Sequence, residues 1–206
     1  TLFAFATLIP AIFLFYGIPR EEPVWLLTTL AIWTSLMLLC FKAYNNSEPI
    51  KLKHLLIAAF LLRLVGLFAI PPWSDDFFRF LWDGDVLRSG VNPYLFKPID
   101  INVKSIVEMN QLNSPEYFTV YPPLAQWLFA SISALFPHDL ITRLSTLRLA
   151  FIIVDMSAVF LLFRILKGLK LPPNLIILYA LNPLVVMELS GNLHLETFMV
   201  FGLLLS

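Results

Sequence analysis

The sequence predicts an all-α polytopic membrane protein. Hydrophobic residues make up 59% of its 206 positions and charged residues only 14%, whereas soluble domains hold about 45–50% apolar and about 25% charged residues. Several apolar runs also approach the roughly 20 residues that a helix needs to cross a bilayer. The chain begins at Thr1 rather than methionine and stops inside an apolar run at Ser206, so we expect a fragment that is incomplete at its C-terminal end.

Six apolar runs are the expected membrane spans. Basic residues in short loops mark the cytoplasmic side, and Lys42, Lys51 and Lys53 place the loop after the second run there. The loop after the third run then faces outward. The runs cover about residues 2–19, 24–41, 54–71, 149–166, 173–189 and 197 onward.

The segment 72–148 is expected to be an ordered outer loop with interfacial helices. Connections of this length are usually functional or disordered, and the aromatic residues and helical pattern here favour order. A shorter apolar piece at 122–137 lies within it. We expect this piece to be an interfacial or re-entrant helix rather than a span, because that choice leaves the basic residues after 149–166 in the cytoplasm.

The charged residues and the single cysteine restrict which partners and bonds the chain can have. The formal net charge is zero, so no nucleic-acid partner is indicated. The single cysteine, Cys40, excludes an intramolecular disulfide. Asp155 lies in the middle of a predicted span, where an ionisable side chain needs a buried partner.

Residues 74–94, directly after the third run, carry the densest group of charges. On helical spacing, Asp76, Arg79 and Asp83 share one face. We expect a helix that begins near Ser74 as its N-cap and lies on the membrane with its acids in water. A plain solvated face with an Asp76–Arg79 pair is the alternative.

The adjacent acids Asp75 and Asp76 suit two kinds of chemistry. A carboxylate at a membrane boundary can accept the proton of an alcohol that attacks a sugar carbon. Two carboxylates can also hold Mg²⁺ or Mn²⁺ through their oxygen atoms. The residues alone leave both roles open.

Aromatic and polar residues after this pair could contact a substrate. Arg88–Tyr94 read as a helix end with a glycine cap and an Asn-Pro turn. Tyr94 and Trp82 could form a platform for a sugar ring or prenyl chain, or anchor the chain at the membrane interface. Tyr121 precedes a helix that starts with prolines.

A second polar group lies before the last apolar run. His194 and Glu196 stand beside Asn192 at a span boundary, where ionisable residues indicate function by default. Their spacing of two requires a loop or an unwound helix start. They could bind phosphate or an acceptor sugar, or contribute to a metal site, and Glu188 is expected in the same site.

Several motifs follow one another in an order that resembles a known superfamily. They are Asp76-x-x-Arg79-Phe80-x-Trp82-Asp83-Gly84, Gly90-Val91-Asn92-Pro93-Tyr94, Tyr121-Pro122-Pro123-Leu124, and Asn182-Pro183 with Gly191-Asn192-x-His194-x-Glu196. Their order is similar to that of the GT-C integral-membrane glycosyltransferases, above all the polyprenyl- or dolichyl-phosphate-mannose-dependent mannosyltransferases. The likeness covers roughly residues 54–206, a GT-C-like catalytic module that two transmembrane helices in 1–53 precede.

The resemblance implies an inverting glycosyltransferase, with mannose as the expected sugar and an active site on the outer (periplasmic or lumenal) face. The donor would be a polyprenyl-phosphate sugar and the acceptor a hydroxyl of a glycan or lipid-linked molecule, with no cofactor required. The general base in this superfamily is an outer-loop acid, often in an Asp-x-Asp-like motif, whereas Asp75 and Asp76 have no spacer. We favour Asp76 because of its register with Arg79 and the Trp-Asp-Gly that follows.

Further residues would bind the substrates. Positive charge is expected to stabilise the leaving phosphate. The candidates for this role are Arg79, Arg88 and His194, with Lys97, Arg143 and Arg148 as further ones. The full set of expected substrate-binding residues is Arg79, Trp82, Asp83, Arg88, Asn92, Tyr94, Tyr121, Asn192, His194 and Glu196.

Two other classes of protein remain as alternatives. A transporter or lipid flippase would distribute acids at mid-membrane in broken helices, whereas here the acids cluster in the loop and only Asp155 is deep. A non-catalytic subunit of an envelope-assembly complex would keep its function after Asp76→Asn.

Overall fold

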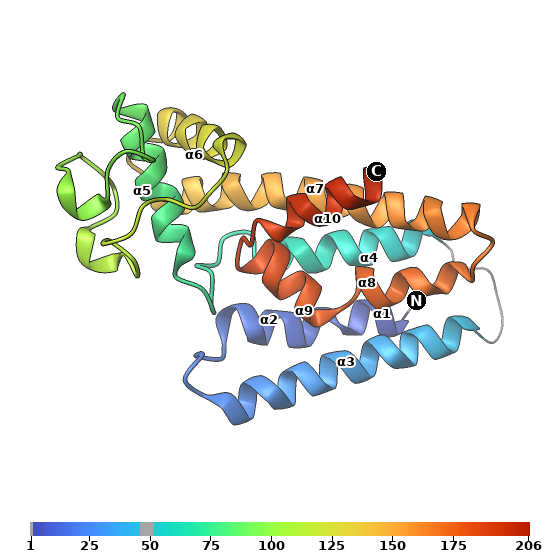
Figure 1. The fold of residues 1–206 in the computed structure, drawn as a ribbon. Coiled ribbons are helices and arrows are strands. Elements are labelled where there is room, and N and C mark those ends of the chain that lie inside the picture. Colours follow the sequence, from blue (N-terminus) through green and yellow to red (C-terminus); the bar gives the residue numbers. More distant parts are fainter. Residues whose placement is uncertain (1, 46–51) are drawn as a thin grey trace. The chain divides into compact units, whose positions relative to one another are not determined.

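The computed structural model describes residues 2–45 and 52–206, and within these ranges the chain forms helices joined by turns, with no strand (Figure 1). The predicted all-α fold class is confirmed. Lys51, which helped to orient the expected spans, lies outside the described residues. The chain divides into two compact units. One consists of Thr1–Pro72 with Arg148–Ser206, and the other of Trp73–Leu147.

Two helices of the described chain are long and apolar enough to cross a membrane. They are α3 (Pro23–Asn45), whose candidate span is Pro23–Tyr44, and α7 (Leu140–Gly168). A third candidate is broken, because its halves Pro173–Ala180 and Pro183–Gly191 are bent by 50°. The first half contains the turn η3 (Pro173–Ile176) and α8 (Ile177–Ala180), and the second contains α9 (Pro183–Val185) and the π-helix η4 (Val186–Gly191).

The first and third expected spans are shorter than their apolar runs. The first run is divided at Thr7 into α1 (Leu2–Ala6) and α2 (Leu8–Tyr16). In the third run, α4 (Leu52–Val65) has 14 residues and ends in turns. In the last run, α10 comprises Glu196–Leu205. An apolar run therefore shows where a chain can enter lipid but not where its helix ends.

The helix expected over 149–166 starts earlier, at Leu140. Asp139 caps it, because its carboxylate accepts the backbone N–H of Thr142 at 3.2 Å and the hydroxyl of Thr142 at 2.5 Å. The polar residues of the first two turns hid this start from a search for apolar runs. The first turns of α7 belong to the Trp73–Leu147 unit. The rest belongs to the unit of Thr1–Pro72 with Arg148–Ser206, called the membrane unit below because it contains α3 and the broken candidate span.

The break in the third candidate span leaves backbone carbonyls without helical partners, and side chains from other helices supply the donors. Arg63 Nη1 donates to the carbonyl of Ala180 at 2.9 Å, and Trp33 Nε1 donates to that of Leu181 at 3.0 Å. Asn182 then caps α9 by accepting the N–H of Leu184 at 2.9 Å. Unpaired backbone groups are costly in an apolar bundle, so these bonds stabilise the bend.

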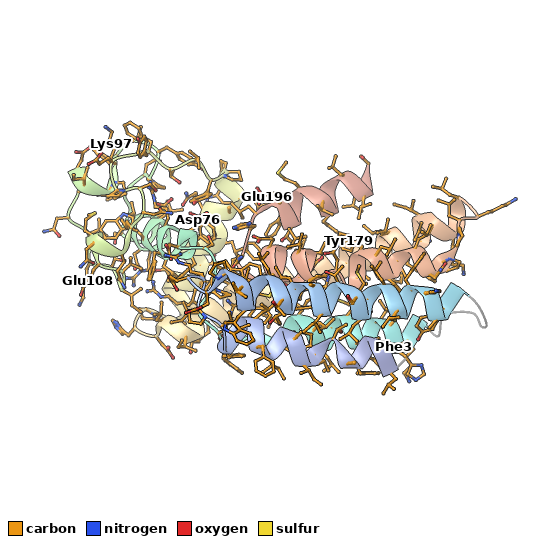
Figure 2. The ribbon with its side chains drawn as sticks, turned by 90° about the horizontal axis from the view of Figure 1, so that it is seen from below. Phe3, Asp76, Lys97, Glu108, Tyr179 and Glu196 are labelled. Carbon is orange, nitrogen blue, oxygen red and sulfur yellow. The ribbon has the colours of Figure 1, made fainter. Side chains whose placement is uncertain are left out.

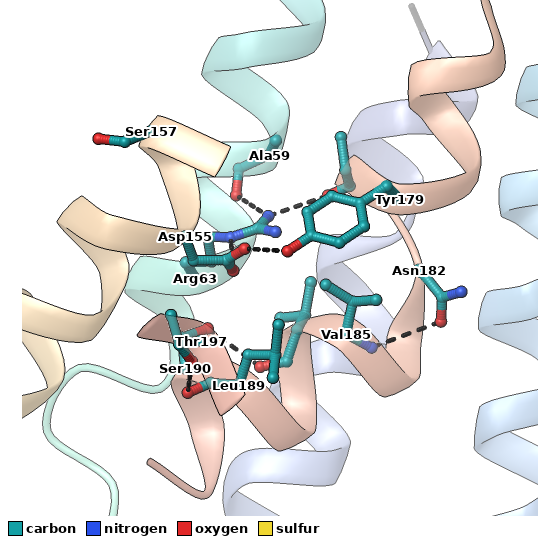
Figure 3. A network of polar contacts seen from close by, with 12 residues as sticks. Ala59, Arg63, Asp155, Ser157, Tyr179, Asn182, Val185, Leu189, Ser190 and Thr197 are labelled. Carbon is teal, nitrogen blue, oxygen red and sulfur yellow. Dashed lines mark hydrogen bonds and ion pairs between the residues drawn. The ribbon is translucent and has the colours of Figure 1, made fainter. Parts of the chain in front are cut away.

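Asp155 has the buried partner that its position required (Figure 3). Arg63 Nε lies 2.7 Å from Asp155 Oδ2, and both side chains are fully buried. The hydroxyl of Tyr179 donates to the other carboxylate oxygen at 3.0 Å. The prediction of a buried partner is confirmed, and the contacts join α4, α7 and α8.

The Trp73–Leu147 unit is built on two short helices, α5 (Asp76–Arg88) and α6 (Pro123–Leu135). They approach closely at Gly84, where an added Cβ would lie 2.6 Å from the carbonyl oxygen of Phe129. The rings of Phe80 and Phe129 stack with centroids 4.8 Å apart. The connection between the two helices carries the 3₁₀ turns η1 (Pro98–Asp100) and η2 (Met109–Gln111).

The length of α6 agrees with the expectation that 122–137 does not span. Its 13 residues rise about 20 Å, which is less than the roughly 30 Å of a hydrocarbon core. Its position at the membrane interface stays a prediction.

The ends of α5 follow local rules. Its N-cap is Asp75 rather than the expected Ser74, whose hydroxyl instead accepts the N–H of Asp76 at 3.3 Å. At the other end Gly90 has a φ of +80°, and the N–H of Val91 reaches the carbonyl of Val86 at 3.2 Å. This is the glycine-based helix end that the sequence predicted.

The Arg63–Asp155 pair generates a stability prediction. Arg63→Met or Asp155→Leu alone should cost about 3–5 kcal/mol of unfolding free energy, because each leaves a buried charge uncompensated. The double variant should cost much less than the sum. Denaturant unfolding of the detergent-solubilised protein measures all three, and additive losses would contradict the account.

Close packing at Gly84 generates a second prediction. Gly84→Ala should destabilise the protein by about 1–3 kcal/mol, because the backbone of Phe129 has to move. The matched control is Gly202→Ala, since an added Cβ at Gly202 meets nothing within 4 Å. Thermal unfolding of both variants measures this loss of stability. Equal unfolding midpoints would contradict the close approach of α5 and α6 at Gly84.

Candidate active site

The part of the charged face of α5 that carries Arg79 and Asp83 is buried, not solvated. Arg79 Nε pairs with Asp83 Oδ1 at 2.8 Å, and the two side chains are 4% and 2% exposed. Arg79 also donates to the carbonyl oxygens of Ser114 and Tyr117 at 3.0 and 3.1 Å. The expectation of a water-facing acid is wrong for Asp83, and Arg79 pairs with Asp83 rather than with Asp76, because the connection to α6 folds back over this part of the helix.

Asp83 is fully occupied by protein donors. Its second oxygen accepts the hydroxyl of Thr119 at 2.5 Å and Nε2 of Gln126 at 2.9 Å. A carboxylate that is buried and bonded on both oxygens holds the unit together and is not accessible to a substrate. The structure therefore gives Arg79 and Asp83 structural contacts in place of the expected contacts to substrate.

Asp85 is a buried acid that the sequence reasoning missed. Arg143 binds both carboxylate oxygens at 3.0 Å, and Ser133, Ser105 and the N–H of Ile106 also donate to them. Burial alone would raise the pKa of Asp85, but the hydrogen bonds, led by that from Arg143, outweigh burial and lower the pKa.

A signal for Asp85 was present in the sequence. It lies nine residues after Asp76, which on helical spacing is the opposite face of α5. That face is otherwise apolar, and a carboxylate there requires a buried donor. Arg143 was expected to be a phosphate ligand, but the structure commits it to Asp85 and to the carbonyls of Phe136 and Pro137.

Asp76, which is labelled in Figure 2, differs from the other two acids of α5. It is half-buried in the first helical turn, and its Oδ1 accepts Nδ2 of Asn113 at 2.9 Å. Among the described residues, only Asn113 donates to its carboxylate. Asp75, the N-cap, is also half-buried, so the two adjacent acids are the accessible ones of this helix.

Tyr121 lies close to this carboxylate. Its ring meets that of Phe80 edge-on, with centroids 4.8 Å apart. Burial, and then the negative charges of Asp76 and Asp83, raise the pKa of the Tyr121 phenol well above its ordinary value. The Tyr121 hydroxyl is therefore neutral at any physiological pH.

The expected aromatic platform is only half present. Trp82 is 4% exposed, so it packs inside the unit and offers no face to a ligand. Tyr94 is accessible, and its hydroxyl donates to the carbonyl of Tyr121 at 2.5 Å. Burial, followed by the charge of Asp83, raises the pKa of Tyr94.

Arg88 does not meet Asp76. They stand at opposite ends of α5, about 18 Å apart at 1.5 Å per residue. Arg88 lies 3.6 Å from Asp85 and lines a separate cavity of about 350 Å³ with Lys104 and His138. A leaving phosphate at Asp76 is therefore out of its reach.

The second expected polar group forms within the membrane unit. His194 Nδ1 and Asn192 Nδ2 each lie 3.2 Å from Oε2 of Glu188, which confirms that Glu188 belongs with them. The chain between η4 and α10 is unwound, and buried Leu193 has a φ of +64°. Such a conformation costs about 1–3 kcal/mol and is typical of functional sites. Glu196 is exposed at the start of α10.

Arg148 is also unavailable to a phosphate. It is fully buried and donates to five backbone carbonyls of its own unit, at distances of 2.6–3.2 Å. Lys97 remains accessible beside the ring of Phe118. Of the three further phosphate candidates, two have become structural.

The acidic pair does not form a complete metal site by itself. Carboxylate oxygens suit Mg²⁺ or Mn²⁺, but nowhere in residues 2–45 and 52–206 do three His, Cys, Asp or Glu side chains come together around one point. A divalent metal at Asp75 and Asp76 stays a prediction, and no step of the chemistry below depends on it.

Comparison with known proteins gives one match. A family model described as alpha-(1->6)-mannopyranosyltransferase, N-terminal domain, matches residues 12–206. The match includes most of the 1–53 region that precedes the expected GT-C-like motifs. No curated protein matches the chain, and no solved structure matches it.

The Asp85 contacts generate a pH prediction. Asp85→Asn should cost about 3–5 kcal/mol at neutral pH, because Arg143 is left buried without its partner. The folded pKa lies below the ordinary value of 3.8, so the contribution of Asp85 is complete above that pH and is lost as the pH falls through the folded pKa.

Urea unfolding of wild type and Asp85→Asn between pH 3 and 8 checks this expectation. The two stabilities should differ by a constant amount at neutral pH and converge in acid. The exposed Asp100→Asn is the matched control and should follow wild type throughout. A difference that grew as the pH fell would contradict the lowered pKa.

Proposed function

Because the chain belongs to the alpha-(1->6)-mannopyranosyltransferase N-terminal domain family, we propose that it transfers mannose from a polyprenyl-phosphate donor to a hydroxyl of a glycan or lipid-linked acceptor. Family membership makes it a glycosyltransferase rather than a transporter or an assembly subunit. The donor and the outer-face location are supported by the resemblance of the motifs to GT-C enzymes. The apolar helices α3 and α7 are compatible with a membrane protein that meets a lipid-linked donor.

The observation that carries the assignment of the base is the difference between the acids of α5. Asp83 and Asp85 are buried and bonded on both oxygens. Asp76 is half-buried, and a single amide donates to it. A general base needs an oxygen that can accept the proton of the acceptor hydroxyl, and Asp76 has a carboxylate oxygen to which no described residue donates. Asp75 is the alternative base.

The proposed step is one displacement. The acceptor oxygen forms a bond to the anomeric carbon of mannose as the bond from that carbon to the phosphate oxygen breaks. The hydroxyl proton passes to Asp76, and polyprenyl phosphate leaves with the electron pair. The Asn113 amide holds one oxygen of Asp76 at 2.9 Å and so orients the other toward the acceptor.

The course of the reaction follows from a single displacement. Attack opposite to the leaving phosphate inverts the anomeric carbon, so a β-linked donor yields an α-linked product. The family description names an alpha-(1->6) linkage, which makes a primary C6 hydroxyl the proposed nucleophile.

Further residues are proposed to bind the substrates. His194 and Asn192, held by Glu188, are proposed ligands of phosphate or sugar. Exposed Glu196 and Tyr94 are proposed contacts to the acceptor.

The role of Asp76 generates an activity prediction. In the full-length membrane protein, Asp76→Asn should lower kcat for mannosyl transfer from polyprenyl-phosphate-mannose by about 10²–10⁴-fold, because an amide cannot take the proton. Transfer of radiolabelled mannose to a mannan acceptor measures it. Asp100→Asn, an exposed acid of the same unit, should keep wild-type activity.

Two further arms decide the alternatives. Loss of activity in Asp75→Asn with Asp76→Asn unaffected would move the base to Asp75, and full activity in both would refute a base in α5. Loss of activity with a chelator, restored by Mg²⁺ or Mn²⁺, would assign the pair to a metal. No transfer by wild type from this donor would refute the donor assignment.

A further inference from the structure

A pocket lies where the end of α5 meets the start of α6. Its volume is about 270 Å³, and Leu87 together with residues 90–94, Pro123, Gln126 and Trp127 line it. All of these residues belong to the Trp73–Leu147 unit. The positive φ of Gly90 turns the chain out of α5, so that Asn92 and Tyr94 form one wall. None of the contacts described for Asp76 belongs to this pocket.

Gln126 provides an unpaired acceptor in this pocket. It is 1% exposed, and its Nε2 donates to Asp83 Oδ2 at 2.9 Å and to Thr119 Oγ1 at 2.8 Å. An ionised carboxylate only accepts hydrogen bonds, so Asp83 sets which way the amide points. The amide oxygen then has no partner among the described residues. It is screened from bulk water, and because Gln126 lines the pocket, a molecule bound there can supply the missing donor.

Aromatic and amide groups form the rest of the lining. Trp127 is 66% exposed and Tyr94 is 38% exposed, so both rings are accessible. Asn92 Oδ1 accepts the N–H of Tyr94 at 3.0 Å, which holds the turn and leaves the Nδ2 donors of Asn92 at the open rim. An apolar ring together with a few fixed donors and acceptors is the usual composition of a site for a small polar molecule.

These features match the two sides of a sugar. A pyranose ring presents an apolar face of C–H groups and a rim of hydroxyls, each a donor and an acceptor. Trp127 suits the face, the Gln126 oxygen suits a hydroxyl donor, and the Asn92 amide suits a hydroxyl acceptor. The volume lies just below the roughly 300–1,000 Å³ of sites for drug-sized ligands, which suits one ring rather than a polyprenyl chain.

We propose that this pocket is a distal subsite for the glycan acceptor, in which one mannose ring of an acceptor chain binds away from the ring that is attacked. The inference rests on the proposed mannosyl transfer. Gln126 is bonded to Asp83, seven residues and about 10 Å along α5 from Asp76. A chain of several sugar rings spans that distance, whereas a single monosaccharide does not.

The competing occupant is the membrane interface. Exposed tryptophans commonly anchor proteins at the headgroup level. An anchor, however, needs neither a pocket nor a screened acceptor such as the Gln126 oxygen. The control for a role in anchoring is Trp25, which lies near the start of α3. Trp25 is 64% exposed, almost the same fraction as Trp127.

The first test measures binding without turnover. Saturation-transfer NMR titration of the full-length protein in detergent with α-1,6-linked mannobiose should show binding that Trp127→Ala weakens by about tenfold. Trp127→Phe should weaken it less, because a smaller ring remains, and Trp25→Ala should have no effect. Affinity that is unchanged in Trp127→Ala, or lost equally in Trp25→Ala, would overturn the proposal. The proposal is also overturned if Trp127→Ala changes only the quenching of tryptophan fluorescence by brominated lipid vesicles, because Trp127 would then be a membrane anchor.

A second test separates the subsite from the proposed reaction. With a long α-1,6-mannan acceptor, Trp127→Ala should raise KM by about tenfold at unchanged kcat, and with a monosaccharide acceptor it should change neither value. An equal effect on both acceptors would overturn the distal placement. Mannobiose binding that depends on Trp127 in a protein without mannosyl transfer would refute the proposed reaction and leave the pocket as a sugar site.

Discussion

The membrane unit depends on one constraint: a backbone carbonyl that loses its helical partner inside an apolar bundle must find a donor. Arg148 meets this demand at two places at once. Its guanidinium donates to the carbonyls of Gly66, Leu67 and Ala69 in the turns that follow α4, and to those of Ser190 and Gly191 at the end of η4. These five bonds stabilise the points at which the two chain segments leave their helices.

The broken helix shows what this arrangement permits. Arg63 and Trp33 complete the bonding at the bend, and Arg148 holds the π-helix that follows. The unwound chain then places His194 and Asn192 against Glu188. Buried cations thus act on the backbone, and they make room for irregular chain where polar side chains can gather. For Arg148, this differs from the role of phosphate ligand that its charge suggested.

In the Trp73–Leu147 unit, the buried acids are likewise paired with donors from other segments. Asp83 and Asp85 are each surrounded by donors from the connection, from α6 or from α7. These bonds fix the helix that carries Asp76. Chemical difference between the acids of α5 therefore comes from what packs over each one, because the side chains are identical and differ only in register.

Sequence reasoning predicted what depends on nearby residues. The helical class, the glycine turn at Gly90, the need of Asp155 for a partner and the association of Glu188 with His194 all follow from composition, local spacing or burial. The burial of Arg79 and Asp83 could not be predicted in this way, because Ser114, Thr119 and Gln126 come from segments more than 30 residues away. Span lengths failed for a related reason, since apolar runs do not show where tertiary contacts interrupt a helix.

The central claim is that the carboxylate of Asp76 on α5 is accessible, whereas those of Asp83 and Asp85 are buried and hydrogen-bonded. Carbodiimide labelling of the full-length protein, with each modified acid quantified by mass spectrometry and mannosyl transfer followed in parallel, tests it most directly. The account predicts that Asp76 is modified early, that transfer is lost in step with it, and that Asp83 and Asp85 react only after unfolding. Full transfer after complete modification of Asp76, or equally fast modification of Asp83, would contradict it.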